Sequence, residues 1–108
     1  MSFFAARVSG PSMAPTLRSG DLILARRATS ARPGDIVVAR FRSRPDLLVV
    51  KRVARPEAGG WWLVSDNGFT SDDSRAYGVA DVVGRVVVRY WPSPRLVMRH
   101  KGTGVTEP

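Results

Sequence analysis

The sequence predicts a mostly β fold, in which a small antiparallel sheet curls on itself into a barrel. Apolar residues fall in short runs rich in Val, Ile, Leu and Trp, which are typical of strands. Clusters of Gly, Pro, Asp and Ser separate these runs at a spacing of about 8 to 14 residues. No segment shows the apolar period of a long amphipathic helix. Short strands at such a spacing are typical of barrels and sandwiches.

Five or six strands are expected, and the sequence shows five clear runs with four turn signals. The strands cover residues 22–25, 36–39, 47–50, 61–64 and 82–91. The turns cover residues 18–21, 32–35, 55–60 and 65–68. The one helical candidate is a single turn just after Ser12, because Pro15 is tolerated in the first turn of a helix.

The chain has 108 residues, of which 44% are hydrophobic, and this is enough for one core. We expect one domain over residues 1–92, followed by a flexible tail over 93–108, where Pro, Gly, Thr and charge replace the strand pattern. The apolar stretch at 1–8 is far shorter than the ~20 residues that span a bilayer. Because Arg or Asp interrupts every later run, we expect no membrane span and a cytoplasmic protein.

The net charge is +8, which raises the question of an anionic partner. The arginines are scattered from Arg7 to Arg99, with no block of like charges and no recognition helix. We therefore expect no nucleic-acid partner. A basic β module that binds nucleic acid stays as the non-enzymatic alternative.

Several kinds of active site can be set aside. There is no cysteine, so a thiolate nucleophile and a Cys-based zinc site are excluded. The only histidine is His100, in the expected tail, which disfavours a Ser-His-Asp triad. The carboxylates Asp66, Asp72 and Asp73 have no His or Cys nearby and fit a solvated loop better than a metal site. No Gly-rich turn leads into a helix, so we expect neither a cofactor nor a metal.

Lys51 is the remaining candidate base, since the only other lysine, Lys101, lies in the expected tail. Strand alternation places Lys51 on the same face as Val49 and Val53. If that face is buried, desolvation lowers the pKa of the amine and lets it accept a proton, which an arginine cannot do. A lysine on an edge strand that reaches out to water is the alternative, and this stretch alone favours it.

Ser12 is the candidate nucleophile, because Gly10, Pro11 and Pro15 restrict the backbone around it. Such a segment can present a hydroxyl and aim its own N–H at an oxyanion. Taken alone, a serine between Gly and Pro is more often a turn residue.

The two candidates belong to a series of short motifs that closely resembles the conserved boxes of the type I signal peptidase family, in the same order, over residues 8–88. The motifs are Ser12-Met13-x-Pro15-Thr16-Leu17, Gly20-Asp21, Lys51-Arg52, Asp66-Asn67 and Ser71-x-Asp73-Ser74-Arg75-x-Tyr77-Gly78. The resemblance implies a small antiparallel β core of the signal peptidase type. It also implies a serine endopeptidase in which a neutral lysine activates the serine and an acyl-enzyme forms.

The resemblance also implies a role for each matched residue. Ser12 is implied to be the nucleophile and a main-chain oxyanion donor, and Lys51 the general base. Ser71 matches the serine that orients the lysine. Asp73 and Arg75 match an ion pair that braces the site, for which an ordinary surface pair worth at most ~1 kcal/mol is the alternative.

Three positions near the site add to this interpretation. Met13 matches a residue that packs beside the serine, and we expect a core side chain there. Gly10 stands where many family members carry a hydroxyl that helps form the oxyanion hole, so we expect main-chain donors to form it here. Ser65 replaces the usual glycine before Asp66.

The substrate is expected to be a precursor protein. The sequence shows neither an N-terminal membrane helix nor the longer insertion of signal peptidases, and residues 10–17 and a Trp-Trp run are similar to the nickel-type superoxide dismutase maturation proteases. That similarity implies removal of a short N-terminal propeptide from a nickel superoxide dismutase precursor. The alternatives are a signal peptidase whose anchor is missing and the C-terminal domain of a self-cleaving repressor.

Overall fold

The structure is a computed structural model that describes residues 2–99. Seven strands and one short helix are present in this range. In chain order they are β1 (Phe3–Arg7), β2 (Leu22–Arg27), β3 (Ile36–Phe41), β4 (Arg44–Glu57), β5 (Gly60–Val64), α1 (Ser74–Tyr77), β6 (Ala80–Trp91) and β7 (Arg95–Leu96). The prediction of a mostly β fold is therefore confirmed.

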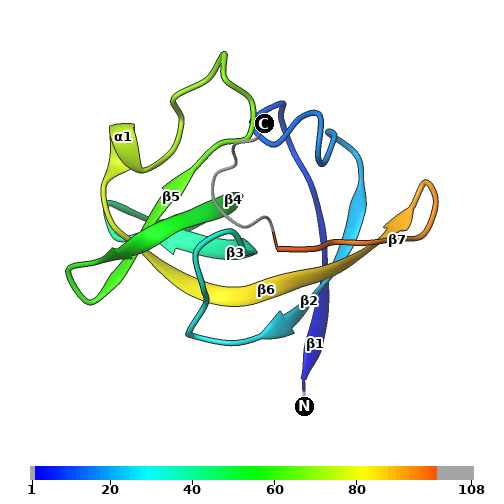
Figure 1. Cartoon of the computed structure of the whole chain (residues 1–108), viewed down its shortest axis with the longest axis horizontal. Helices are drawn as coiled ribbons and strands as arrows, with labels where there is room; N and C mark the ends of the chain where they lie inside the picture. Colours follow the sequence, from blue (N-terminus) through cyan, green and yellow to red (C-terminus); the bar gives the residue numbers. More distant parts are fainter. Residues whose placement is uncertain (1, 100–108) are drawn as a thin grey trace, which may run out of the picture.

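All seven strands belong to one antiparallel sheet with the order β1-β2-β6-β3-β4-β5, and β7 also pairs with β6. A further pairing between Trp61 of β5 and Ala80 of β6 brings β6, β3, β4 and β5 into a partial ring. Figure 1 shows β6 as a long curved strand that crosses the molecule, from β3 and β5 at one end to β2 and β7 at the other. The expected curling of the sheet is confirmed.

The curled sheet encloses two clusters of buried side chains, and β6 contributes to both. Val86 belongs to the first cluster, between β1, β2 and the segment after β1. Val82 belongs to the second cluster, inside the partial ring. Gly84 lies between them, where a Cβ atom would come within 2.7 Å of the Phe4 ring and 2.9 Å of the Arg26 carbonyl oxygen. The crossing of the two halves therefore requires glycine at this position.

All five expected strands are present, and the structure adds two that the sequence pattern did not indicate. Residues 55–57, expected in a turn, extend β4 because they pair with residues of β5. The turn is confined to Ala58 and Gly59, whose φ angles are 50° and 78°. The unexpected β1 has no β-branched residue, and it forms a strand because it pairs with β2 along its whole length.

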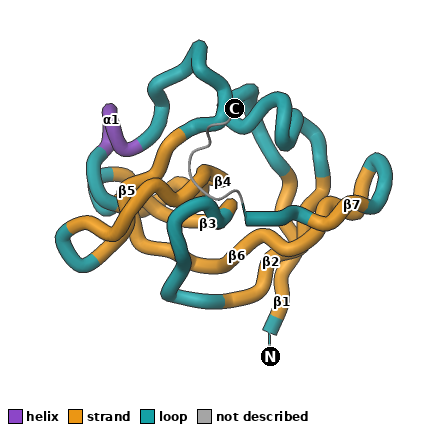
Figure 2. The backbone as a smooth tube through the Cα atoms, in the orientation of Figure 1, coloured by secondary structure: helices purple, strands orange, loops and turns teal. Residues whose placement is uncertain are grey.

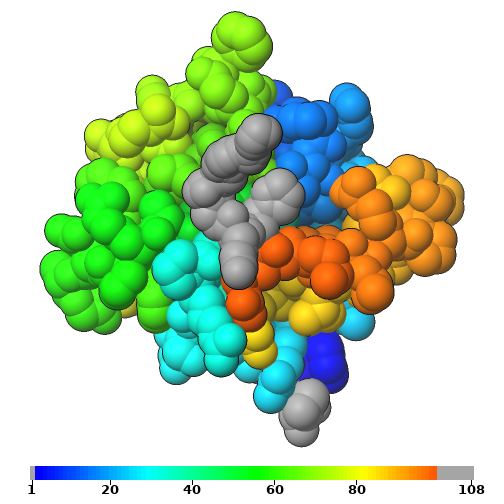
Figure 3. Space-filling model, viewed as in Figure 1, coloured from blue at the N-terminus to red at the C-terminus, as the bar shows by residue number. Residues whose placement is uncertain are grey.

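The first part of the expected tail lies against the sheet. β7 pairs with β6, Val97 packs against the first cluster, and Arg99 Nε donates to Asp35 Oδ1 at 3.1 Å. Figure 3 shows this segment, in orange, across the face of the molecule. Residues 100–108, with His100 and Lys101, lie outside the described residues. Between residues 2 and 99, no helix is both long and apolar enough to cross a bilayer.

Candidate active site

Ser12 and Lys51 meet in the structure, although 39 residues separate them in the sequence. Lys51 lies on β4 opposite Val37 of β3, and Ser12 lies in the turn after β1. The distance from Lys51 Nζ to Ser12 Oγ is 2.6 Å. Lys51 is only 5% exposed, so its side chain points into the molecule and not to water.

Burial changes the acidity of Lys51. Desolvation lowers the pKa of its amine below the ordinary lysine value, and the charges of Asp73 and Asp72 oppose this shift. Less free energy is therefore needed to deprotonate Lys51 than to deprotonate an exposed lysine. In that state the Ser12 hydroxyl can donate its hydrogen to Nζ, as a general base requires.

The opposing effect of Asp72 leads to a prediction about the pH dependence of cleavage. Activity that needs the neutral amine rises with pH through the pKa of Lys51. Because the Asp72 charge raises that pKa, Asp72→Asn should lower it and move the acidic limb of the kcat/KM profile to lower pH. The control is Glu57→Gln, which removes an exposed carboxylate paired with Arg55. A limb that stays in place, or that moves equally in the control, would contradict this role of Asp72.

The turn that carries Ser12 is held by the first core cluster. Ala14 N–H donates to Pro11 O at 3.0 Å, and Leu17 N–H donates to Met13 O at 2.9 Å. Met13 and Leu17 are 1% and 0% exposed. Their burial anchors the turn from below, and Ser12 remains partly exposed above them.

The main chain supplies a candidate oxyanion donor. The N–H of Ser12 has no acceptor among residues 2–99. Gly10 has a φ angle of 84° and its N–H donates to Ser19 Oγ at 3.2 Å. It offers no side-chain donor, and an unpaired N–H beside a hydroxyl is the kind of group that stabilises a tetrahedral oxyanion.

Ser71 does not contact Lys51 in the structure. Its side chain is exposed, and across residues 2–99 no hydrogen bond joins it to the lysine amine. Its main-chain carbonyl accepts instead from the N–H of Asp73 at 2.8 Å. An orienting role for Ser71 therefore stays a prediction, because the hydrogen bond to Lys51 that this role requires is not formed here.

Asp73 and Arg75 form the expected ion pair, with Arg75 Nη2 2.8 Å from Asp73 Oδ2. Asp73 is fully buried, begins α1 as its N-cap, and accepts the N–H of Ser65 at 2.8 Å. Burial alone would raise the pKa of this carboxyl. The hydrogen bonds from Arg75 and from the Ser65 N–H outweigh burial and lower the pKa to about 2.

The low pKa of Asp73 predicts how stability depends on pH. A carboxyl whose pKa is lowered by folding stabilises the protein above its unfolded pKa, near 4, and this contribution is lost as pH falls toward 2. Asp73→Asn should lower the free energy of unfolding by about 2 kcal/mol at pH 7. The difference from the wild type should shrink toward pH 2. Urea unfolding at several pH values measures it, and a constant difference down to pH 2 would contradict the assignment.

A second ion pair next to the dyad was not assigned a role from the sequence. Arg52 Nε and Nη2 donate to Asp66 Oδ1 and Oδ2 at 2.8 and 2.5 Å. The Thr16 hydroxyl donates to Asp66 Oδ2 at 2.6 Å, and Arg52 Nη1 donates to Gly34 O at 2.8 Å. Arg52 follows the candidate base, and Thr16 lies in the turn of the candidate nucleophile. Asp66 therefore connects the two segments that bring the dyad together.

A cleft of ≈ 210 Å³ lies beside the dyad. Its lining residues are Arg7, Val8, Ser9, Ser12, Leu47, Leu48, Val49, Val50 and Lys51. In this part of β4 the strand pairs with β3 on one side, whereas β5 begins to pair only at Arg52. The other edge of residues 47–50 is therefore open to an extended peptide, which can add to a sheet edge as a further strand.

A serine hydroxyl lies against a buried lysine amine, beside an unpaired N–H and a cleft with an open strand edge. A serine peptidase that uses a lysine base requires such an arrangement. The chain belongs to the Peptidase S24-like family, whose model matches residues 1–87. The family confirms the expectation of a serine peptidase.

The chain is also similar to mitochondrial inner membrane proteases from several organisms. The mitochondrial inner membrane protease subunit 1 of Xenopus tropicalis is 36% identical, over 78% of this chain and 66% of the relative. The protein of the same name in Homo sapiens is 32% identical over 78% and 67%, and that of Schizosaccharomyces pombe is 34% identical over 80% and 72%. The chain thus spans about two thirds of the length of the first two of these relatives.

The names of these relatives bear on the expected location and on the expected substrate. The expected cytoplasmic location is contradicted, because the relatives are named as proteases of the mitochondrial inner membrane. They agree better with the signal peptidase alternative than with maturation of a nickel superoxide dismutase.

Proposed function

We propose that this chain is an endopeptidase that removes N-terminal segments from precursor proteins, with Ser12 as nucleophile and Lys51 as general base. The observation that carries the proposal is the 2.6 Å contact between the Ser12 hydroxyl and a lysine amine that is 5% exposed. Membership of a serine peptidase family supports it.

In the first half of the reaction, neutral Lys51 takes the proton from Ser12 Oγ as this oxygen attacks the carbonyl carbon of the scissile peptide bond. The negative charge that develops on the carbonyl oxygen is stabilised by the N–H of Ser12. Lys51 then donates the proton to the leaving nitrogen as the C–N bond breaks. An ester between Ser12 and the N-terminal part of the substrate remains.

In the second half, water attacks the ester carbonyl and gives a proton to Lys51. The C–O bond to Ser12 breaks, and Lys51 returns the proton to Ser12 Oγ. The carboxylate product leaves, and the dyad is restored. No group other than the dyad needs to titrate in this sequence.

We further propose that the chain acts at a membrane surface, as the names of its relatives suggest. Opposite residues of antiparallel strands share a face. In the half-sheet of β1, β2, β6 and β7, one such face packs on the first core cluster, and the register gives the other face a series of apolar side chains. We call the apolar residues Phe3, Ala5, Leu22, Leu24, Val88, Trp91 and Leu96 the apolar outer face. Arg7 and Arg26 share this side of the sheet, opposite Leu22 and Phe3.

The apolar outer face carries more exposed apolar side chains than is usual for a sheet face that meets water. Phe3, Trp91 and Leu96 are 45%, 59% and 72% exposed. An antiparallel sheet with one solvated face normally carries polar residues there. An exposed apolar face is typical of a binding surface, and aromatic side chains such as tryptophan favour the boundary between lipid and water.

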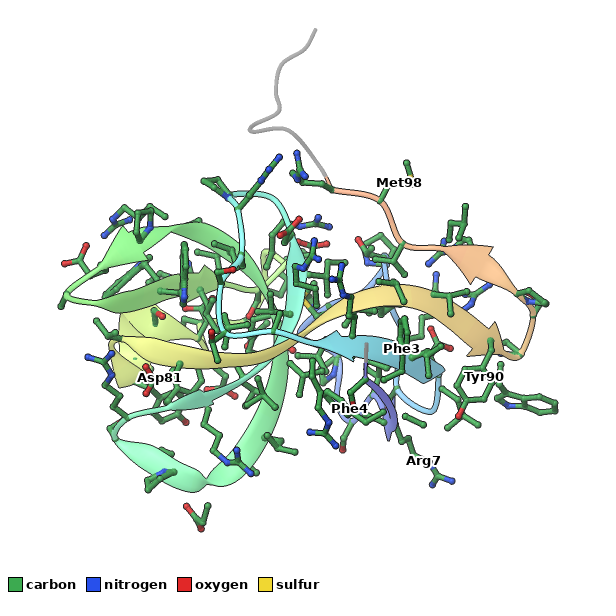
Figure 4. The ribbon with its side chains drawn as sticks, turned by 90° about the horizontal axis from the view of Figure 1, so that it is seen from below. Phe3, Phe4, Arg7, Asp81, Tyr90 and Met98 are labelled. Atoms are coloured by element: carbon green, nitrogen blue, oxygen red, sulfur yellow. The ribbon has the colours of Figure 1, made fainter. Side chains whose placement is uncertain are left out.

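The charge of the molecule is concentrated in the same half. Residues 2–28 and 84–99 carry eight arginines and a single acidic residue, Asp21, which is buried. Residues 29–83 carry eight basic and seven acidic residues. Figure 4 shows Phe3, Arg7 and Tyr90 at one end of the molecule and Asp81 at the other. An apolar face among arginines is suited to a membrane that contains anionic lipids.

This surface predicts binding to lipid vesicles. The wild type should sediment with vesicles that contain anionic lipid, and Trp91→Ser with Leu96→Ser should reduce the partition coefficient by about tenfold or more, because both substitutions remove exposed apolar area. Phe69→Ser is the control, because Phe69 is 101% exposed but lies in the loop after β5. Absence of wild-type binding at low salt, or equal loss in the control, would contradict a membrane role for this face.

The motif at residues 10–17 and the Trp61-Trp62 run keep a nickel superoxide dismutase precursor as a second candidate substrate. One experiment tests both substrates. The purified chain is incubated separately with a precursor that carries a signal peptide and with the dismutase precursor, and the new N-termini are sequenced. Cleavage that Ser12→Ala abolishes identifies the substrate. Failure to cut either precursor at a single site, or cleavage that survives Ser12→Ala, would overturn the proposed function.

A further inference from the structure

Asn67 contacts the candidate nucleophile from the loop after β5. Its side-chain Nδ2 donates to Pro11 O at 3.0 Å, and its main-chain N–H donates to Ser12 O at 2.9 Å. Its Oδ1 accepts the N–H of Phe69 at 2.9 Å, which leaves Nδ2 pointing at Pro11. Figure 2 shows the loop after β1 and the loop after β5 side by side at one end of the sheet. Asn67 is therefore the junction between these two loops.

We infer that Asn67 is a positioning residue that aims the main-chain N–H of Ser12 at the oxyanion of the reaction. This inference rests on the proposed peptidase function and assigns to Asn67 a role in it. The carbonyl of Pro11 and the N–H of Ser12 belong to one peptide unit, which is not among the cis bonds of the structure. In a planar trans unit these two groups point in opposite directions. A donor that fixes the Pro11 oxygen thus also fixes the direction of the Ser12 N–H.

The hydrogen bonds hold this peptide unit on more than one side. Pro11 O accepts from Asn67 Nδ2 and from Ala14 N–H, each at 3.0 Å. The following carbonyl, that of Ser12, accepts from the Asn67 N–H. Rotation of the peptide unit that carries the Ser12 N–H would break the bonds to Pro11 O. Two donors on the same carbonyl oxygen also polarise the amide and make its N–H a stronger donor.

The composition of the site explains why such support matters here. Gly10 lacks the hydroxyl that could share the oxyanion, so the Ser12 N–H carries more of that charge. The N–H has no acceptor within residues 2–99 and is available to the substrate. Preorganised donors act most strongly when they do not have to reorient during the reaction.

The test distinguishes a role of Asn67 in positioning the Ser12 N–H from a role in stabilising the loop alone. Asn67→Asp keeps the shape and the acceptor for the Phe69 N–H but removes the donor to Pro11 O, and Asn67→Ala removes both. For a substrate that the wild type cleaves, each variant should lower kcat by about 10- to 100-fold with little change in KM, less than the loss of a direct oxyanion donor. Inhibition by a substrate-like peptide aldehyde, whose adduct with Ser12 carries the oxyanion, should weaken by the same factor.

Phe69→Ala is the control, because it leaves the main-chain N–H that holds Asn67 Oδ1 and removes only an exposed ring. It should keep the wild-type kcat. Circular dichroism and thermal unfolding identify any variant that fails to fold. If Asn67→Ala does not fold, the isosteric Asn67→Asp variant is used for the test. An unchanged kcat, an increase confined to KM, or unchanged aldehyde inhibition in a folded variant would overturn the inference. Absence of cleavage by the wild type would instead count against the proposed function.

Discussion

Replacement of Lys51 by arginine is expected to lower kcat/KM for precursor cleavage by about 10³- to 10⁴-fold, the upper range for loss of a general base. Arginine keeps the positive charge and approximate length, but its guanidinium does not give up its proton at any working pH. The Ser12 hydroxyl would then have no acceptor for its hydrogen within the described site. Cleavage of a fluorescent peptide that spans the precursor junction measures the loss.

The pH dependence makes this test sharper. The wild type should gain activity as pH rises through the lowered pKa of Lys51, whereas any residual activity of Lys51→Arg should lack that limb. Ser12→Ala is the companion variant and should lose acylation by a serine-directed reagent. A variant Lys51→Arg that keeps more than about a tenth of the wild-type rate would show that another group acts as base.

Removal of the Asp66 carboxylate is expected to have the largest effect on stability. Asp66→Ala should lower the free energy of unfolding by about 3 kcal/mol, because it leaves the charge of Arg52, whose side chain is 12% exposed, without its carboxylate partner. It also releases the Thr16 hydroxyl, so the turn of Ser12 and the strand of Lys51 lose a connection. We therefore expect kcat to fall as well, even at temperatures where the variant is folded.

The matched control for this prediction is another Arg-Asp pair in the same sheet. Arg42 and Asp81 form an ion pair at 2.8 Å, but their side chains are 46% and 59% exposed. Asp81→Ala should cost less than about 1 kcal/mol, since water screens an exposed pair. Urea unfolding of the two variants compares them directly. Equal losses would show that the burial of the Arg52-Asp66 pair has no special weight.

The fold was predictable because strand periodicity is local. The expected strands at 22–25, 36–39, 47–50, 61–64 and 82–91 all occur. Most of these runs place side chains in the core, whereas Leu47 and Leu48 are 46% and 47% exposed. The pattern missed β1 because its residues Phe3–Arg7 become a strand only through pairing with β2. It also placed residues 93–99 in a tail, because the packing of Val97 on the first core cluster is a long-range contact.

The candidate site also has features that the sequence predicted and features that only the structure shows. Ser12 became a candidate nucleophile because Gly and Pro restrict the backbone around it, although this context alone favours an ordinary turn residue. The order of the short motifs joined Ser12 to Lys51, but periodicity could not decide between a buried base and an edge lysine. For Ser71, a motif position suggested an orienting role, and the structure places its side chain in solvent.

By itself the sequence determined most of the strand pattern and the restricted backbone around Ser12, because these depend on neighbours along the chain. Its motifs also named Ser12 and Lys51 as the candidate dyad. The tertiary structure alone decided that Lys51 is buried and 2.6 Å from Ser12. It also decided that Asp66 joins Arg52 to Thr16, and that Asn67 holds the carbonyl of Pro11. These contacts cross 14 to 56 residues of chain, and only the closing of the sheet brings their partners within hydrogen-bond distance.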